Sequence, residues 1–443
     1  MLWTAAGVVV LGFLITLEIA ARQYGLPGPL TTQVQEVILP PKSGFLLYGS
    51  MALMMVVLTR RQRFIAAGIA IGIDSVFLLE RWAFDVKVTD GHHPFGNGAL
   101  WVILGFAVIA VTRRTGQERV LLLKGVGLAL LLVAGRKTGD TWLLITSKAR
   151  PTVLDQYVAT ADRALGDPSW LVGRIVKATG PIGFHVLDLV YGQLAVAAVV
   201  VALYQLRNVA AERRFPTHHL VRTFLVIGLL GPAIYMIFPV VGPVFAYGAG
   251  VDHWPSPDMG PDALPSVHFA VADIWPHTLP SLNAPHPMQF DKFTPRNCMP
   301  SLHTAWATAI FIHSRKGPRI LRFAGTFWLI ATLCATLGFG YHYGADLIAG
   351  MVFTLTIEAA LRAYDRGWDR SGIQLVAYGA AVFVALLVAY RWLPLEMAKH
   401  PWAFGPLLIL ALISVVYGYV RTTRAWEPVV APVRQPQPQP EPA

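Results

Sequence analysis

The chain has 443 residues, of which 55% are hydrophobic and only 14% are charged. Because soluble domains carry about 25% charged residues, this composition excludes an ordinary soluble domain and indicates a membrane protein. The net charge of +11 does not indicate nucleic-acid binding, since no basic run is interleaved with aromatic residues and lysine and arginine mark the cytoplasmic loops of membrane proteins. Two cysteines, Cys298 and Cys334, cannot supply a metal cluster, so we expect neither a metal nor another cofactor.

Apolar stretches recur along the whole chain, many of them close to the roughly 20 residues that a helix needs to cross a membrane. They predict an all-α, polytopic bundle of about 12 transmembrane helices. No lysine or arginine precedes the first stretch, so we interpret it as a retained span and not as a signal peptide. The predicted spans are residues 2–21, 44–59, 64–80, 99–112, 120–135, 183–206, 219–239, 301–313, 320–338, 343–362, 374–393 and 403–420.

Arginine and lysine are concentrated in every second connection between these spans. By the positive-inside rule, these connections and both termini lie in the cytoplasm, and the intervening connections lie outside. We therefore expect an integral protein of the plasma or inner membrane whose active site faces the outer, extracytoplasmic side. The basic residues of the alternate connections are Arg60, Arg61, Arg63, Arg113, Arg114, Arg119, Arg207, Arg213, Arg214, Arg315, Lys316, Arg319, Arg362, Arg366, Arg370, Arg421 and Arg424.

Hydropathy and composition divide the chain into segments. Residues 240–300 are rich in proline, histidine and aspartate, and we expect them to form a cap over the outer surface. The predicted segments are N-terminal membrane helices with no assigned role (1–135), an interfacial amphipathic segment (136–182), a membrane core that includes the cap (183–362), C-terminal membrane helices (363–428) and a disordered tail rich in proline and glutamine (429–443).

Two polar motifs stand where predicted apolar helices meet outer connections. One is Pro300-Ser301-Leu302-His303, and the other runs from His342 to Asp346. Positions i and i+4 share one face of a helix, so Asp346 is expected to contact a ring nitrogen of His342, fix its tautomer and leave the other nitrogen free. A histidine oriented by a carboxylate can act as a nucleophile, and a second histidine nearby can act as a separate proton donor, which is typical of covalent catalysis.

These motifs resemble the Pro-Ser-x-His and His-x-x-x-Asp signatures of the type 2 phosphatidic acid phosphatase superfamily. Together with Tyr157–Gly166, they are most similar to its inositol phosphorylceramide synthase-like (inositolphosphotransferase) branch, over residues 150–360. The resemblance implies a six-helix phosphatase-like core in the C-terminal half of the chain. It also implies a membrane lipid, either a phospholipid or a lipid phosphate, as the substrate.

The resemblance further implies a role for each motif residue. His342 is the expected nucleophile and forms a phosphohistidine, Asp346 orients it, and His303 protonates the leaving alkoxide. Ser301 and backbone N–H groups at the start of the 301–313 helix are expected to hold phosphate oxygens, because a helix N-terminus favours anions. That helix rises only about 20 Å, so His303 is expected to lie recessed near headgroup depth, where a lipid enters sideways from the outer leaflet.

The cationic phosphate clamp of the superfamily is incomplete in this chain. Ala335 and Thr336 stand where a Ser-Arg pair usually precedes the second motif, and Leu143 replaces the lysine expected before Arg150-Pro151. An arginine suits phosphate best because its guanidinium binds in a bidentate manner. The candidate cations are Lys148, Arg150 and Arg296, together with Arg136 and Lys137, which we weigh equally as cations that bind lipid headgroups.

A second Pro-Ser-x-His, ending at His268, lies 35 residues before the first. We prefer His303, because its motif opens a long apolar helix, whereas His268 is soon followed by Asp273 and Pro276. An inactive His268→Ala variant beside an active His303→Ala variant would reverse this assignment.

Two reactions share the expected phosphohistidine. A hydroxyl acceptor makes the protein a phosphotransferase, such as one that moves phosphoinositol between lipids, and this is the reaction that the resemblance favours. Water as the acceptor makes it a lipid phosphate phosphatase. A lipid transporter with a degenerate phosphatase core is an alternative from another class, favoured by the many spans and the missing clamp. Because all three motif residues are present, we prefer a metal-independent, histidine-dependent enzyme.

Overall fold

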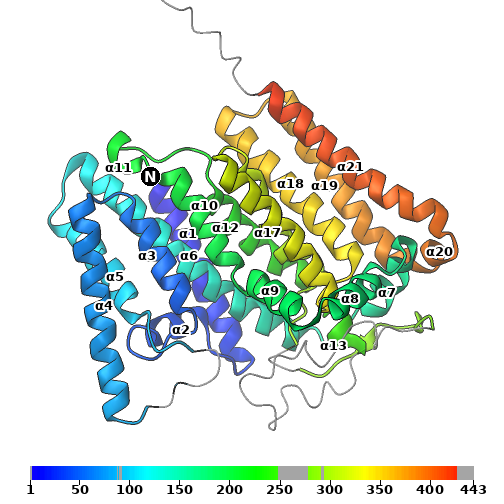
Figure 1. Cartoon of the computed structure of the whole chain (residues 1–443), viewed down its shortest axis with the longest axis horizontal. Helices are drawn as coiled ribbons and strands as arrows, with labels where there is room; N and C mark the ends of the chain where they lie inside the picture. The colour runs from blue at the N-terminus through cyan, green and yellow to red at the C-terminus, as the bar shows by residue number, and fades with distance from the viewer. Residues whose placement is uncertain (1, 87, 89–91, 248–277, 291–293, 427–443) are drawn as a thin grey trace, which may run out of the picture.

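The computed structural model describes residues 2–86, 88, 92–247, 278–290 and 294–426, with the backbone alone for residues 2–9. These residues form helices almost throughout, and one short antiparallel sheet pairs β1 (Thr152–Val153) with β2 (His286–Pro287). Figure 1 shows the helices side by side in one bundle, with the N-terminal helices in blue at one flank and the C-terminal helices in red at the other. The prediction of an all-α membrane protein is confirmed.

The helices before the first polar motif are α1 (Leu2–Gln23), α2 (Pro29–Gln35), α3 (Gly44–Met55), α4 (Arg60–Ala83), α5 (Asn97–Thr112), α6 (Gly116–Ala149), α7 (Asp155–Asp162), η1 (Arg163–Leu165), α8 (Pro168–Ala178), α9 (Gly180–Gly192), α10 (Leu194–Leu206), α11 (Val209–Glu212), α12 (Leu220–Ile237) and α13 (Pro243–Tyr247). Those after it are α16 (Leu302–Ser314), α17 (Arg319–Gly338), α18 (Gly344–Arg366), α19 (Arg370–Trp392), α20 (Pro394–Lys399) and α21 (Pro401–Ala425).

Seven helical segments in the described part of the chain are long and apolar enough to cross a membrane: α4, α10–α11, α12, α17, α18, α19 and α21. Two further apolar helices, α3 and α5, are shorter than a full span. The number of membrane crossings therefore stays a prediction, although every predicted apolar stretch from residue 44 onward coincides with helix.

Helix α6 differs from the boundary that hydropathy suggested at residue 135, because it continues without a break to Ala149. The residues after 135 contain no proline, and their charges are paired within the protein. Arg136 forms an i,i+4 ion pair with Asp140, and buried Lys137 pairs with Glu36 of the segment after α2. With these charges paired, α6 runs as one helix of 34 residues.

Two large hydrophobic clusters hold the bundle together. One is centred on α3, α5 and α6, and it also takes in Ala202, Leu206 and Val221 from α10 and α12. The other joins α7, α10, α12, α16, α18, α19 and α21. Because α10 and α12 contribute to both clusters, the N-terminal helices pack directly on the helices that carry the polar motifs.

The predicted cap is described in part. Within residues 278–290, β2 pairs with β1, and the Met288 N–H donates to Pro151 O. This part of the predicted cap is therefore fixed to residues 151–153. Residues 248–277 and 291–293, which include the second Pro-Ser-x-His and His268, lie outside the described residues, as does the predicted disordered tail.

Candidate active site

The first motif forms the start of α16. Ser301 is the N-cap, and its Oγ accepts the Thr304 N–H at 3.3 Å, which satisfies one of the helix's unpaired N–H groups. The Ser301 N–H donates to Asp346 O at 3.2 Å, so the start of α16 is fixed against the first turn of α18. The two helices can approach this closely because residue 350 is a glycine. A Cβ at that position would lie 2.5 Å from Ser301 O.

The second motif joins α17 to α18. Asp346 Oδ2 lies 3.4 Å from His342 Nδ1, accepts the Tyr343 N–H at 2.8 Å, and accepts the Cys298 thiol at 2.6 Å. The predicted contact of His342 with Asp346 is present, but its geometry is different. His342 precedes α18, and Asp346 reaches back from the first helical turn as a capping residue.

His303 and His342 converge on one another. Their ring centroids are 6.3 Å apart with 59° between the ring planes. Tyr191, from the end of α9, stacks on His303 at 4.1 Å, and its hydroxyl lies 3.1 Å from His303 Nδ1. His342 Nδ1 faces Asp346 Oδ2 at 3.4 Å and Cys298 Sγ at 3.3 Å, and His303 Nδ1 faces the Tyr191 hydroxyl, so Nε2 is the nitrogen left to act in each ring.

Burial tunes the groups of the connecting loops. It lowers the pKa of His342 to about 3, so the imidazole keeps its lone pair throughout the neutral range. Burial also raises the pKa of the Cys298 thiol well above its ordinary value. Cys298, His342 and Asp346 have their ligand atoms within 4.8 Å of one another, and in this structure the Cys298 thiol donates to Asp346 Oδ2 at 2.6 Å.

Two buried aspartates of the α7 segment hold the loops that carry the motifs. Asp155 accepts the N–H groups of Val241 and Gly242 at 3.0 and 2.8 Å and the Tyr343 hydroxyl at 2.9 Å. Asp162 Oδ1 accepts the N–H of Ala345 at 2.8 Å. These carboxylates therefore fix the 241–242 backbone and the residues that follow His342, and the hydroxyl that Asp155 accepts is that of Tyr343.

The predicted phosphate-binding cations contact backbone carbonyls in this structure. Lys148 Nζ donates to Tyr24 O at 2.6 Å, and Arg150 Nε donates to Met236 O at 2.6 Å. Fully buried Arg296 donates to the carbonyls of its own 288–296 loop. Arg136 of α6 is half-exposed and pairs with Asp140, and buried Lys137 pairs with Glu36. Each of the five candidates thus has a partner within the protein.

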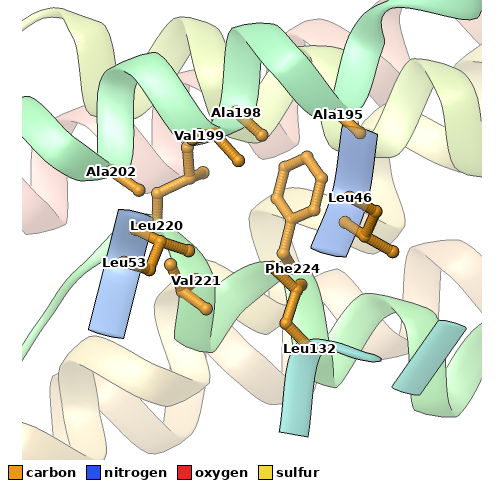
Figure 2. Close-up of a pocket in the computed structure, with 10 residues that line it drawn as sticks. All are labelled: Leu46, Leu53, Leu132, Ala195, Ala198, Val199, Ala202, Leu220, Val221 and Phe224. Carbon is orange, nitrogen blue, oxygen red and sulfur yellow. The ribbon is translucent and has the colours of Figure 1, made fainter. Parts of the chain in front are cut away.

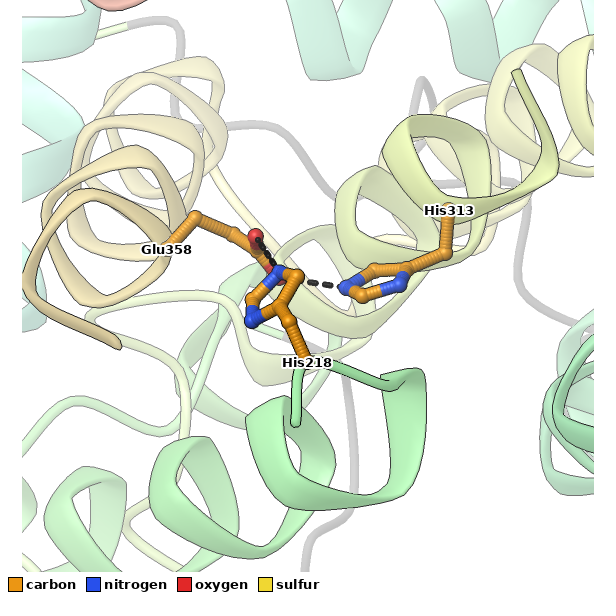
Figure 3. Close-up of side chains that lie close together, drawn as sticks. All are labelled: His218, His313 and Glu358. Carbon is orange, nitrogen blue, oxygen red and sulfur yellow. Dashed lines mark hydrogen bonds and ion pairs between the residues drawn. The ribbon is translucent and has the colours of Figure 1, made fainter. Parts of the chain in front are cut away.

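A second group of ionisable side chains lies at the other end of α16, among the arginine-rich connections (Figure 3). His313 Nε2 is 2.6 Å from Glu358 Oε1, and His218 Nε2 is 2.9 Å from Glu358 Oε2. The two imidazoles stack with centroids 5.0 Å apart. No local motif predicts this trio, because its members are 95 and 45 residues apart in the chain.

The trio has the composition of a metal site, but its hydrogen bonds argue against one. Gln205 Oε1 accepts the Leu220 N–H at 2.9 Å, which fixes the orientation of the amide. The Gln205 NH₂ group therefore faces His313 Nδ1, at 2.8 Å. Nδ1 must accept, so the His313 proton is on Nε2 and is donated to Glu358. This trio is best described as a buried hydrogen-bond network that joins α12, α16 and α18.

Two segments of the chain match known family models. Residues 156–360 match the PAP2 superfamily, and residues 1–145 match a domain of unknown function (DUF5933). The first match contains His303, His342 and Asp346; it supports the superfamily that the motifs predicted and leaves the branch a prediction. A phosphatase-type or phosphotransferase-type reaction on a lipid phosphoester follows from that superfamily. No curated protein and no solved structure matches the chain.

Proposed function

We propose that this integral membrane protein, whose residues 156–360 match the PAP2 superfamily, is a lipid phosphotransferase that works through a phosphohistidine. The observation that carries the proposal is the convergence of two imidazoles, 6.3 Å apart, each with Nδ1 already engaged. Two such rings provide a nucleophile and a separate proton donor for one phosphorus atom placed between them.

In the first step, His342 Nε2 attacks the phosphorus of the lipid phosphoester. The bond from phosphorus to the leaving oxygen breaks, and that oxygen takes a proton from His303. Asp346 stabilises the positive charge that the imidazole of His342 gains as its bond to phosphorus forms. The Ser301 hydroxyl and the His303 N–H at the start of α16 provide donors for the phosphate oxygens, and Arg136 of α6 is the proposed source of positive charge.

In the second step, an acceptor hydroxyl attacks the phosphohistidine and gives its proton to His303, which restores both rings. A lipid or polyol hydroxyl is the proposed acceptor. Support for transfer over hydrolysis comes from burial: His342 is 4% exposed and Asp346 is fully buried, and a site poor in water favours an organic acceptor. Inositol phosphate is the headgroup that the sequence resemblance favours.

The proposal is tested with purified protein in detergent micelles, given phosphatidylinositol or phosphatidic acid labelled with ³²P in the headgroup. With an added ceramide acceptor, we expect the label in a ceramide-linked lipid, and without an acceptor only slow release of a water-soluble product. Predominant release in the presence of the acceptor would identify a phosphatase.

Acid quenching should trap an acid-labile ³²P-protein in the wild type and none in His342→Ala. Exposed His400, in the α20–α21 connection, supplies a matched control, since His400→Ala should retain the trapped label. Activity that survives in His342→Ala would overturn the proposal. Lipid transport that survives this replacement, with no turnover in the wild type, would support the transporter instead.

A further inference from the structure

An apolar cavity of about 50 Å³ lies between the N-terminal helices and the helices that carry the motifs (Figure 2). Its walls come from α3 and α6 on one side and from α10 and α12 on the other. The side chains that line it are all hydrophobic: Leu46, Leu53, Leu132, Ala195, Ala198, Val199, Ala202, Leu220, Val221 and Phe224. A cavity with such walls excludes water and polar ligands and favours an apolar occupant.

The cavity is elongated along the helix axes. On α10 its lining residues run from Ala195 to Ala202, which corresponds to a rise of about 10 Å. On α3 they run from Leu46 to Leu53, over the same length. Figure 2 shows Leu46 and Ala195 at one end of the cavity and Leu53 and Ala202 at the other. Its long direction is therefore that of a hydrocarbon chain in the bilayer.

Two aromatic rings connect the lining of the cavity to His303. The indole of Trp306, one turn after His303 on α16, lies 6.2 Å from its imidazole and stacks on the ring of Phe224 at 5.5 Å. Phe224 in turn lines the cavity. On α9 and α10 the link is equally short, since Tyr191, which stacks on His303, precedes the lining residue Ala195 by four positions.

The distance between the level of His303 and the cavity can be estimated along α12. Leu302, next to His303, packs against Gly231, whereas the cavity extends along α12 from Phe224 to Leu220. The distance along α12 from Gly231 to Leu220 is about 16 Å. A lipid whose phosphate lies at His303 and His342 would therefore place the middle of an acyl chain at this cavity.

We propose that the cavity binds an acyl chain of the lipid substrate, and this inference rests on the proposed function. The cavity has room for about three or four groups of methylene size, so it holds a segment of the chain. Because bilayer lipid is as apolar as the cavity, the preference comes from close packing and not from the hydrophobic effect. The N-terminal helices thus provide one wall of the substrate site.

The test compares acyl chain lengths in cavity variants. Ala198 is 7% exposed and faces the cavity, whereas Val200 of the same helix is 52% exposed on its outer face. With the headgroup that the wild type turns over, Ala198→Phe should lower turnover of lipids with 16-carbon chains at least tenfold and change that of 8-carbon lipids less than twofold. Val200→Phe should change neither. A similar loss at both chain lengths in Ala198→Phe would overturn the inference.

Photocrosslinking tests the same inference in a protein that does not turn over the lipid and whose cavity residues are unchanged. Phosphatidic acid with a diazirine at mid-chain is irradiated with full-length His342→Ala protein, and the adducts are mapped by mass spectrometry. Adducts on Leu132, Ala198 or Phe224, stronger than those from a diazirine phosphatidylcholine, are expected. Adducts confined to the outer face of α10, or equal labelling by both lipids, would show that bulk lipid is labelled and would overturn the inference. If no lipid is turned over, the proposed function fails, and the adducts still decide the occupant.

Discussion

Replacing Asp346 by asparagine tests the proposed nucleophile with little change in shape. The carboxylate lies 3.4 Å from His342 Nδ1 and accepts the Tyr343 N–H and the Cys298 thiol. An asparagine carbonyl still accepts the Tyr343 N–H, so the first turn of α18 should form. The variant loses the negative charge beside the imidazole, which becomes positive when it is bound to phosphorus.

The size of the effect follows from the separation of the charges. Two unit charges 3.4 Å apart attract by about 5 kcal/mol at an effective dielectric constant of about 20. Loss of that stabilisation in the transition state corresponds to a fall in kcat of about 10³-fold to 10⁴-fold. Formation of the phosphoenzyme should slow by the same factor, because the charge appears in that step.

A second buried aspartate serves as the matched control. Asp74 of α4 is likewise buried and hydrogen-bonded, since it accepts two backbone N–H groups and a hydroxyl, from Gly96, Gly98 and Tyr48, but it belongs to the N-terminal helices. Asp74→Asn should lower the thermal midpoint and leave the kcat of the folded protein within about twofold. Rapid-quench measurement of ³²P-protein, with thermal midpoints in parallel, separates the two effects. An Asp346→Asn enzyme with more than a tenth of wild-type phosphorylation would refute the assigned role.

Three further predictions follow from the described contacts. Gly242 has φ of 101°, and a Cβ there would lie 2.3 Å from Tyr341 O, so Gly242→Ala should lower both the thermal midpoint and the activity; an unchanged variant would show that the loop moves freely. Burial lowers the pKa of His342 to about 3, so phosphoenzyme formation should not lose its nucleophile between pH 8 and about 4. Because the unfolded histidine binds a proton below about pH 6.5, the stability should fall by up to about 1.4 kcal/mol per pH unit between 6.5 and 3. A phosphorylation step that titrates near 6.5 through His342 would contradict this. Glu358→Gln should cost about 3–5 kcal/mol of stability by leaving buried partners unpaired, with activity indifferent to EDTA before and after; zinc bound in proportion to protein, and lost in Glu358→Gln, would instead make the trio a metal site.

The part of the site that the sequence could predict is the part formed by short-range geometry. A four-residue spacing put Asp346 beside His342, and an apolar run predicted the helix that begins next to Ser301. Even there the reason differed, since His342 lies outside the helix and is reached by a capping carboxylate. Local spacing determined which residues meet, whereas the turn between α17 and α18 determined how.

The residues that the sequence could not assign are those brought in by packing between distant helices. Tyr191 ends an apolar helix with no flanking motif, so its place on His303 became visible in the bundle alone. Arg150 and Lys148 are candidate phosphate-binding cations by sequence, but nearby carbonyl oxygens take their N–H groups. A charged side chain binds the partner that its own backbone position brings within reach, and hydropathy does not specify that position.

Helix α6 is the element that makes the two matched regions one functional unit. Residues 1–145 and 156–360 match separate families, yet α6 runs through the first boundary without a break to Ala149. From this one helix, Leu132 lines the cavity, Arg136 pairs with Asp140, and Lys137 fixes the helix to Glu36. Because a continuous helix transmits any displacement along its axis, removing the helices that hold its first half would shift the cavity wall and the charges that α6 carries. The N-terminal region is therefore expected to be required for the reaction even though it carries none of the reacting groups.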